Sequence, residues 1–471
     1  MSAFNFYTLR QKILSTLILA FLLRLLTFLL LPKLVFTNLA PDEGMYASLA
    51  KWLGESNPVN EFPGYGDIIY RQSKAFILPA SVLFRLGINE LDAIRIISSL
   101  YGLGSLVIVG LFAFKYLTTS KIQRLEKVRR ILVIGAVILY ALIPSHFLWS
   151  ILGLRESSVE FWTLLTFFSI YKINKSTKWV LSLWASSTIT GIAMVFNSRP
   201  QVGWLLCASL ILSTIISEKN RKTIIIIIAV ALGMVAGNFF NETYTLERTT
   251  SYVLISEDRI TTKIDSGTGT LCLEPKQIVT IENKKYECAL RNQTLDLSGF
   301  SNPGNVLINN IEGITAAQEV RKSGAASEIQ TFPCPVAENS RATRFLCISI
   351  RAPYMAATFL VRPFIFIDTT SFSSFFAAAE NILWMVAFLL LLYGLAKYRS
   401  KLFSKESLPM VMFLVTYVLG AGSYQGNLGT AFRHKSLILW ALLLCVYKVV
   451  LMIFEDRIKA DNRNNSQESA V

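Results

Sequence analysis

The sequence is poor in charged residues and has almost no histidine. Only 16% of its 471 residues are charged, and histidine occurs twice. Acidic residues are the scarcer charged type, 31 against 46 basic residues, which leaves a formal charge of +15. A soluble globular domain carries about 25% charged residues. Because 53% of the residues are hydrophobic and the mean hydropathy is +0.47, the composition excludes an ordinary soluble domain and indicates a polytopic membrane protein.

Several common site motifs are also missing. There is neither a GxxxxGK[ST] nor a GxGxxG stretch, so an ATP or soluble nucleotide-sugar site is not expected. No cysteine pair has CxxC spacing, and no metal site or other cofactor is predicted; a divalent cation could assist but is not indicated. No basic-aromatic module accompanies the positive charge, so nucleic acid is not an expected partner.

Long apolar runs are what the sequence has instead. A helix needs about 20 residues to cross a hydrocarbon layer of about 30 Å. About ten runs approach this length, near residues 13–36, 92–117, 131–150, 157–172, 179–197, 201–217, 223–241, 380–396, 407–424 and 436–454. The first run is too long for a cleaved signal peptide and is expected to stay as an anchor. We therefore predict a polytopic α-helical protein with about ten transmembrane helices.

The basic residues collect in connections that fall on one side when these runs are threaded in order. Basic loops stay in the cytoplasm, so both termini are predicted to be cytoplasmic and the protein to be a multi-pass protein of the plasma (inner) membrane. The net positive charge of the chain is then explained by its cytoplasmic loops, which also attract anionic lipid headgroups. The basic connections are residues 115–130, 171–178, 217–222, 397–406 and 455–463.

A polar segment rich in Thr, Ile and Val interrupts the apolar pattern on the opposite side. Alternating stretches such as residues 277–281 predict short strands, so we expect a small mixed α/β or β-rich extracytoplasmic domain. The predicted organisation is an N-terminal transmembrane module (1–241, with an external loop 37–91), the extracytoplasmic domain (242–350), a membrane-surface segment (351–379), and C-terminal transmembrane helices with a cytoplasmic tail (380–471).

Most of the cysteines belong to this external segment. An even number in an oxidising compartment predicts one or two disulfides, although four cysteines allow three pairings. Four free thiols are the alternative. The candidates are Cys272, Cys288, Cys334 and Cys347.

The ionisable residues near the predicted external face form the candidate site. Ionisable groups at the edge of the hydrocarbon are costly, so a convergent set indicates function. Carboxylates offer a general base, and Lys or Arg can hold a phosphate. With no nucleotide motif, a donor would arrive through the membrane as a lipid-linked phosphate. The set is Asp42, Glu43, Lys74, His146, Arg155, Glu156, Arg199, Arg362, Glu380, Arg433 and His434.

The stretch "PDEGMYASLAKWL", followed by residues 73–113, resembles the first external loop and second span of the GT-C glycosyltransferases. This superfamily includes protein O-mannosyltransferases and lipid A aminoarabinose transferases. Asp42 and Glu43 match the acidic pair of that loop, and Lys74 stands at the position of its lysine, although Ala75 replaces the expected proline. With falling specificity, the likeness extends to residues 143–162, 197–201, 361–384 and 426–439, while 242–350 matches no family module.

The resemblance implies an inverting transfer of a sugar from a polyprenyl-phosphate donor to an extracytoplasmic glycan, lipid or protein. Asp42 would be the general base, supported by Glu43, and Lys74, Arg155 and Arg433 would bind the donor phosphate. The remaining residues would orient these groups or the acceptor: Glu156, His146, Arg199, Arg362, Glu380 and His434.

Alternatives stay open at this point. Asp42 could cap the helix that follows it, Arg155 and Glu156 could be a capping ion pair, and Arg433 could be a headgroup anchor. At the level of the whole chain, a transporter or flippase of lipid-linked sugars and a non-catalytic membrane scaffold remain alternatives. The sequence does not identify the sugar or the acceptor.

Overall fold

The structure of the protein is a computed structural model. The residues that it describes are 3–34, 41–59, 62, 66–117, 123–176, 178–217, 221–240, 251–256, 259–260, 278–281, 284–291, 341–364, 368, 372–424 and 428–468.

Helices dominate the described chain. Their bounds are α1 Ala3–Leu34, α2 Pro41–Gly54, α3 Gly66–Arg71, α4 Lys74–Arg85, α5 Glu90–Tyr116, α6 Gln123–Leu142, α7 Pro144–Trp149, α8 Glu156–Lys175, α9 Lys178–Ser198, α10 Pro200–Ile216, α11 Arg221–Phe240, α13 Arg341–Val361, α14 Phe372–Lys397, α15 Arg399–Leu402, α16 Leu408–Tyr424, α17 Leu428–Lys435, the 3-10 turn η4 Ser436–Ile438, and α18 Leu439–Glu468.

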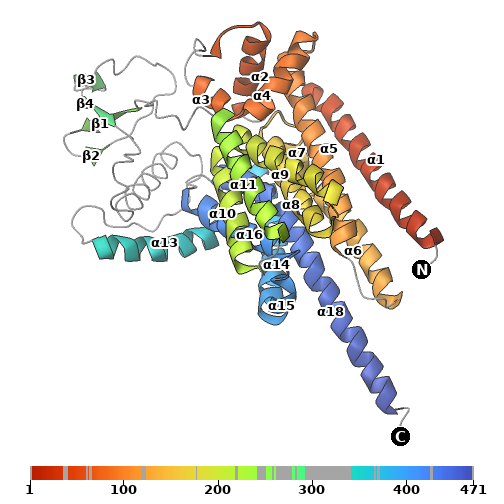
Figure 1. Ribbon diagram of the computed structural model, residues 1–471. Helices are drawn as coiled ribbons and strands as arrows, with labels where there is room; N and C mark the ends of the chain where they lie inside the picture. Colours follow the sequence, from red (N-terminus) through yellow and green to blue (C-terminus); the bar gives the residue numbers. More distant parts are fainter. Residues whose placement is uncertain are drawn as a thin grey trace.

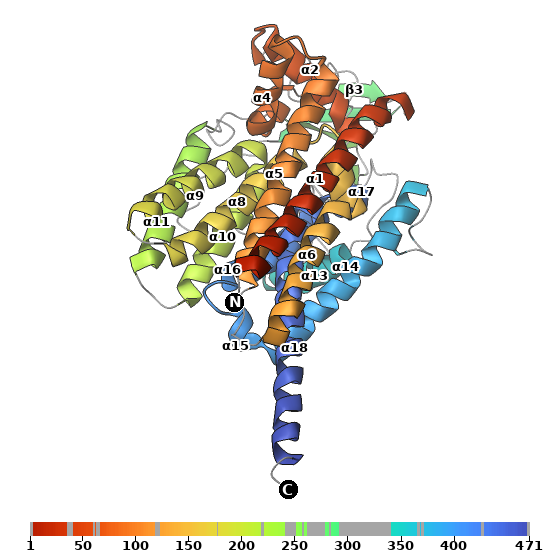
Figure 2. The same ribbon diagram turned by 90° about the vertical axis from the view of Figure 1, so that its right-hand side faces the viewer.

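The long helices form one bundle with distinct ends. Figures 1 and 2 show α2 and α4 at one end and α15 at the other, where α18 continues outward to the C-terminus. In Figure 1 α13 lies beside the bundle and runs across the direction of the long helices. Phe112, Phe167, Phe413 and Trp440 are fully buried and contact one another, so aromatic rings from α5, α8, α16 and α18 hold the centre together.

A second, smaller core lies beneath α2 and α4. Tyr46 and Leu49 of α2 pack with Phe76 of α4 and Ile94 of α5, and all four side chains are buried. The Tyr46 and Phe76 rings meet edge to face with their centroids 5.6 Å apart. This core fixes the start of α2, and with it Asp42 and Glu43, against the bundle.

Helix starts gather the site residues at this end of the bundle. The Asn89 side chain accepts a hydrogen bond from the backbone N–H of Leu91 at 3.0 Å and caps α5. Pro144 and Pro200 open α7 and α10, where their missing N–H costs no helical hydrogen bond. Arg199 therefore stands directly before α10.

The expected number of transmembrane helices is wrong. Among the described residues, five helices are long and apolar enough to cross a membrane by length and composition: Gln11–Leu30, Glu90–Tyr116, Trp179–Ser198, Ala377–Lys397 and Ala431–Asn462. The apolar runs at 201–217 and 407–424 form helices of only 17 residues. Such a helix rises roughly 26 Å, less than the hydrocarbon thickness. The described fold is that of a helical protein with several candidate membrane spans.

Three 20-residue helices, α6, α8 and α11, also fall outside this set, and two of them carry several charged residues. Helix α6 carries Glu126, Arg129 and Arg130 in an ion-paired group near its start. Helix α8 begins with Glu156 and has Glu160 one turn later. Counting apolar runs alone overlooked these charges.

The expected β-containing extracytoplasmic domain is also wrong. The part of the chain whose side chains the structure describes contains no strand. Between residues 242 and 340 only backbone is described, as an antiparallel sheet of order β2-β1-β4-β3. Leu254 pairs with Cys288 and Val279 with Tyr286 in its register. The strands are β1 Ser251–Ser256, β2 Arg259–Ile260, β3 Ile278–Ile281 and β4 Lys284–Arg291.

The disulfide prediction lies outside the described residues. Cys272 and Cys334 are not described, and only the backbone of Cys288 and Cys347 is. The two cysteines with described side chains, Cys207 and Cys445, are buried free thiols.

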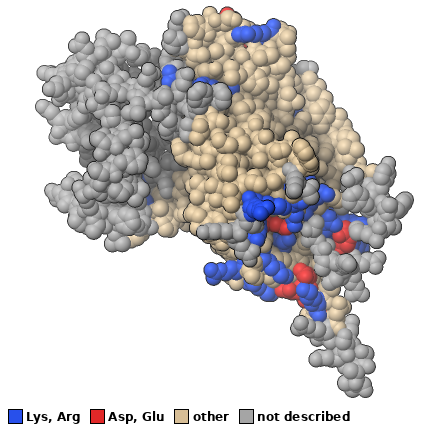
Figure 3. Space-filling model, viewed as in Figure 1, with Lys and Arg blue, Asp and Glu red and all other residues tan. Residues whose placement is uncertain are grey.

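Charge is unevenly distributed over the surface. In Figure 3 most of the visible Lys and Arg gather, together with some Asp and Glu, around the end of the bundle that carries α15 and α18, and a few lie at the opposite end. The flank above this end shows mostly uncharged side chains. This distribution is what the sequence pattern of basic connections predicts for one face of a membrane protein.

Candidate active site

Two carboxylates and three arginines converge where α2, α8, α10 and α17 meet. Arg433 on α17 donates from Nη1 to Asp42 Oδ2 at 2.9 Å, and its Nε lies 3.2 Å from Glu156 Oε1. Arg199 Nη1 donates to the same Oε1 at 3.0 Å. We call Asp42, Arg155, Glu156, Arg199 and Arg433 the carboxylate–arginine cluster. The sequence separated its members by nearly 400 residues, yet the fold brings them together.

Burial divides this cluster into an inner and an outer carboxylate. The Glu156 side chain is 2% exposed and the Arg433 side chain 16%, whereas the Asp42 side chain is 46% exposed. Burial alone raises the pKa of the Glu156 carboxyl, but the neighbouring arginines, Arg433 first, lower it to about 2. Glu156 is therefore a fixed negative charge at neutral pH, and Asp42 is the carboxylate that faces the surroundings.

The cluster carries a net positive charge, and some of its buried polar atoms make no hydrogen bond to each other. Three guanidinium groups against two carboxylates leave one positive charge. Within the described residues, Glu156 Oε2, Arg155 Nε and Arg433 Nε are buried without a hydrogen bond. The contact of Arg433 Nε with Glu156 is thus an ion pair without hydrogen-bond alignment. Buried polar atoms are usually satisfied, so such atoms beside a cationic surplus suit an anionic, hydrogen-bonding ligand.

Arg155 links the cluster to the turn that carries Lys74. Its Nη1 donates to the Gln72 carbonyl at 3.1 Å and to Ser73 Oγ at 3.0 Å. Lys74 follows at the start of α4, with its ammonium 5.7 Å from the centroid of the Tyr70 ring. Lys74 is thus the residue next to Ser73, a partner of Arg155.

Glu43 has a different environment from its neighbour Asp42. It is fully buried and accepts two hydrogen bonds from Arg95, at 2.6 and 3.1 Å. A third comes from the Gly153 backbone N–H at 3.1 Å. Glu43 therefore joins α2 to α5 and to the loop before α8. The sequence did not indicate Arg95 as this partner.

His146 and Glu380 belong to an inner polar network beneath the cluster. His146 Nδ1 lies 3.0 Å from Glu160 Oε2, and the Tyr140 hydroxyl donates to Glu160 Oε1 at 2.8 Å. Glu380 accepts from the Ser145 backbone N–H at 2.8 Å and from its hydroxyl at 2.5 Å. Both residues are buried, so they hold α7 between α8 and α14. Glu160 stands one helical turn after Glu156, a spacing that could have indicated it.

The remaining predicted residues lie around α17. Arg362 forms an ion pair with Asp368. His434 is buried, and its backbone carbonyl accepts from the Tyr417 hydroxyl at 3.2 Å. Lys435, which the sequence did not indicate as a site residue, is fully buried and donates to three acceptors: Leu360 O at 2.9 Å, Arg362 O at 2.5 Å and Asn381 Oδ1 at 2.6 Å.

The described residues contain no group of three or more His, Cys, Asp or Glu side chains that could hold a metal ion.

Comparison with known proteins identifies no family for this chain. No family model matches it, and no curated protein does. Among solved structures, it is similar to the archaeal oligosaccharyltransferase AglB from Archaeoglobus fulgidus, in complex with an inhibitory peptide and a dolichol-phosphate. The identity is 11% and the TM-score 0.47 over 99% of this chain. The chain spans about half, 52%, of that structure's length. At this level the likeness carries no argument about function.

Proposed function

We propose that the protein is an integral-membrane glycosyltransferase. It transfers a sugar from a polyprenyl-phosphate-linked donor to an acceptor on the extracytoplasmic face, with inversion at the anomeric carbon. The observation that carries this proposal is the ion pair of a half-exposed carboxylate, Asp42, with the largely covered Arg433 at 2.9 Å, beside Arg155 and Arg199. A base and a phosphate-binding group then act within one side-chain length of each other.

The cationic surplus suits the charge that develops during transfer. A polyprenyl-phosphate sugar carries one negative charge on its phosphodiester, and the departing polyprenyl phosphate carries a second. Fixed cations that meet this new charge stabilise the transition state more than the ground state. Arg433, Arg155 and Lys74 supply these cations, while Glu156, itself paired with Arg199, holds Arg433 in place.

The chemical step is a single displacement. The acceptor hydroxyl or amine loses its proton to the Asp42 carboxylate as its oxygen or nitrogen forms a bond to the anomeric carbon. The bond between that carbon and the phosphate oxygen breaks, and its electron pair leaves with polyprenyl phosphate. One proton therefore moves to Asp42 and the configuration inverts.

Donor binding also prepares the base. Arg433 Nη1 forms an ion pair with Asp42 Oδ2. A phosphate that takes the Arg433 Nη1 donor removes this ion pair, which frees the Asp42 carboxylate to accept a proton. Glu43 holds the start of α2 through Arg95, and His146, Glu380, Arg362 and His434 keep the surrounding helices in register on the acceptor side.

Transfer from synthetic donors tests this proposal. Membranes containing the protein receive a panel of radiolabelled polyprenyl-phosphate sugars, and two products are measured: free polyprenyl phosphate and labelled acceptor. We expect both in equal amounts for at least one donor. Movement of intact donor across the bilayer without either product would instead identify a transporter. If the protein neither binds any donor of the panel nor releases either product from it, the proposal is contradicted.

A further inference from the structure

The outer face of α4 carries an apolar stripe at the end of the bundle that holds the carboxylate–arginine cluster. Leu78, Val82 and Leu86 follow one another at intervals of one helical turn and are 45%, 54% and 75% exposed. The Leu86 backbone N–H donates to the Val82 carbonyl at 3.2 Å, so the helical turn continues to this residue. Figures 1 and 2 show α4 beside α2 at this end. We call these three residues the α4 stripe.

The opposite face of α4 is already packed. Phe76, Ile77 and Ala80 are fully buried in the second core, against α2 and α5. Arg85, the charged residue in the last turn of α4, reaches back to α2 and donates to the Leu53 carbonyl at 2.9 Å. The α4 stripe therefore stays outside the core, and the nearest charge of its own helix is held by another element.

The α4 stripe begins next to a cation. Lys74 precedes Leu78 by four residues, so the two side chains lie on the same face of α4. Arg155 of the cluster donates from Nη1 to Ser73 Oγ at 3.0 Å, one residue before Lys74. The start of α4 is also the positive end of its helix dipole. A phosphate bound here would lie near two cationic side chains, and a chain attached to it could continue along apolar ones.

The order of groups along α4 is that of a lipid phosphate. From Lys74 to Leu86 the helix rises roughly 18 Å. A cation stands at one end of this length, and exposed apolar side chains follow at each turn. An isoprenoid chain carries no hydrogen-bonding group, so it could cover these side chains without leaving a polar atom unsatisfied.

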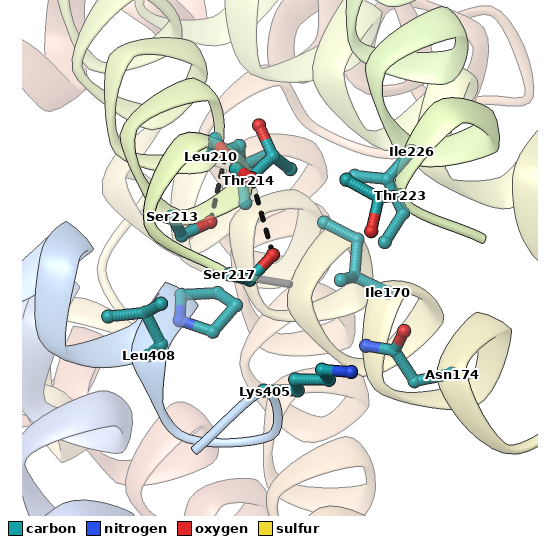
Figure 4. A pocket seen from close by; sticks show the side chains of 11 residues that line it. Ile170, Asn174, Leu210, Ser213, Thr214, Ser217, Thr223, Ile226, Lys405 and Leu408 are labelled. Atoms are coloured by element: carbon teal, nitrogen blue, oxygen red, sulfur yellow. Dashed lines mark hydrogen bonds between the residues drawn. The ribbon is translucent and has the colours of Figure 1, made fainter. Parts of the chain in front are cut away.

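The pocket at the other end of the bundle is no alternative for such a chain. It lies between α8, α10, α11 and the start of α16, and its volume of about 20 Å³ has room for about one water molecule. Ser213 donates to the Leu210 carbonyl at 2.8 Å and Ser217 to the Thr214 carbonyl at 3.3 Å, as the dashed lines of Figure 4 show. A lipid chain does not fit in this pocket.

We propose that the α4 stripe holds the isoprenoid chain of a polyprenyl-phosphate donor, whose phosphate lies at Lys74 and Arg155. This inference rests on the proposed function, because it assigns a path to the lipid of that donor. The chain leaves the site along α4 toward Leu86 and covers the three exposed side chains. Donors with several isoprene units should therefore bind more tightly than donors with a single unit.

Photolabelling of the full-length protein tests this path. The protein is reconstituted in phosphatidylcholine nanodiscs with a polyprenyl phosphate that carries a diazirine on its isoprenoid chain, and the labelled peptides are identified by mass spectrometry. We expect label within residues 78–86, and we expect unlabelled polyprenyl phosphate to displace the probe. Phosphatidic acid, which carries the same phosphate group on two acyl chains, should not displace it at equal concentration.

Matched variants separate the head of the α4 stripe from its length. Lys74→Gln should weaken binding of polyprenyl phosphate about tenfold, the usual effect of losing a hydrogen bond to a charged group. Lys51→Gln, at an exposed lysine of α2, should not. The double variant Val82→Ser with Leu86→Ser should also weaken binding about tenfold. Leu100→Ser, at a position of α5 that is 59% exposed, should leave it unchanged.

The outcomes distinguish this path from the proposed function. Equal labelling by a diazirine phosphatidic acid, unchanged by Lys74→Gln, would overturn the path and show that the α4 stripe only contacts the outer leaflet. Sugar transfer is measured on the same proteins. Label on the α4 stripe without transfer from any donor would contradict the glycosyltransferase proposal and support the path. Transfer by a protein whose α4 stripe takes no label would contradict the path alone.

Discussion

Asp42 and Glu43 show how neighbouring residues of the same chemistry acquire different roles. Successive residues of an α-helix point about 100° apart. At the start of α2 this rotation directs Asp42 toward Arg433 and Glu43 toward Arg95. The sequence predicted an acidic pair at the membrane surface, but only the packed neighbours decide which carboxylate remains accessible.

Glu43→Gln should destabilise the protein rather than alter the chemistry. Removing one partner of a buried ion pair leaves Arg95 uncompensated, which costs about 3 kcal/mol. We expect a clear fall in the unfolding temperature in detergent, with the exposed Glu55→Gln as the matched control. Unchanged stability combined with lost sugar transfer would instead make Glu43 a catalytic group.

Glu156 predicts a specific pH dependence of stability. Its pKa in the folded state is about 2, below the ordinary value of 4.5. The unfolded chain therefore binds the proton more readily, so the stabilisation is complete above about pH 4.5 and is lost as the pH falls towards 2. The free energy of unfolding of wild type should decline in this window relative to Glu156→Gln. Parallel curves for the two proteins would show that the arginines do not hold this charge.

Several site residues could be predicted from the sequence because ionisable residues are rare in such a chain. Asp42, Arg155, Glu156, Arg199 and Arg433 were all indicated in this way, and the fold brings them together. Lys435 was not indicated, because a lysine after Arg433 and His434 looks like part of a basic surface turn. Its burial depends on carbonyls from α13 and the following loop, which no local pattern reveals.

At the scale of elements, Lys435 acts as a clamp on α17. It ties the end of α17 to the end of α13 and to Asn381 of α14. Arg433 lies two residues earlier on the same short helix. The clamp therefore sets where the Arg433 guanidinium meets Glu156 and Asp42.

Lys435→Met should reduce sugar transfer through Arg433. A displacement of about 1 Å at a reacting centre can cost roughly 100-fold in rate. We expect such a loss, and expect the double variant with Arg433→Gln to be no slower than Arg433→Gln alone. Additive losses in this double-mutant cycle would mean that Lys435 acts independently of Arg433.

At the scale of the whole molecule, the sequence predicted a helical membrane protein correctly but not its number of spans. Apolar runs were counted by length, whereas α6 and α8 carry charges and α10 and α16 are short. The β-containing domain was predicted from alternating residues, but the part of the chain whose side chains are described contains no strand. The orientation of the chain in the membrane is inferred from the basic connections alone and stays a prediction.

Cysteine labelling tests that orientation. In a background with the four outer cysteines replaced by serine, a membrane-impermeant maleimide should label Glu55→Cys in intact cells. Lys459→Cys, exposed at the opposite end, should react only after permeabilisation. Labelling of Lys459→Cys in intact cells would reverse the predicted topology.

The central claim is that Asp42 accepts the acceptor's proton beside a phosphate held by arginines. The most direct test measures the rate at which Asp42→Asn releases polyprenyl phosphate from the donor. Wild type and the control variant Glu55→Gln are measured beside it. We predict a loss of roughly 100-fold to 10,000-fold in the rate, with donor binding retained. Release at the wild-type rate would contradict the claim and leave Asp42 as an N-terminal charge of α2.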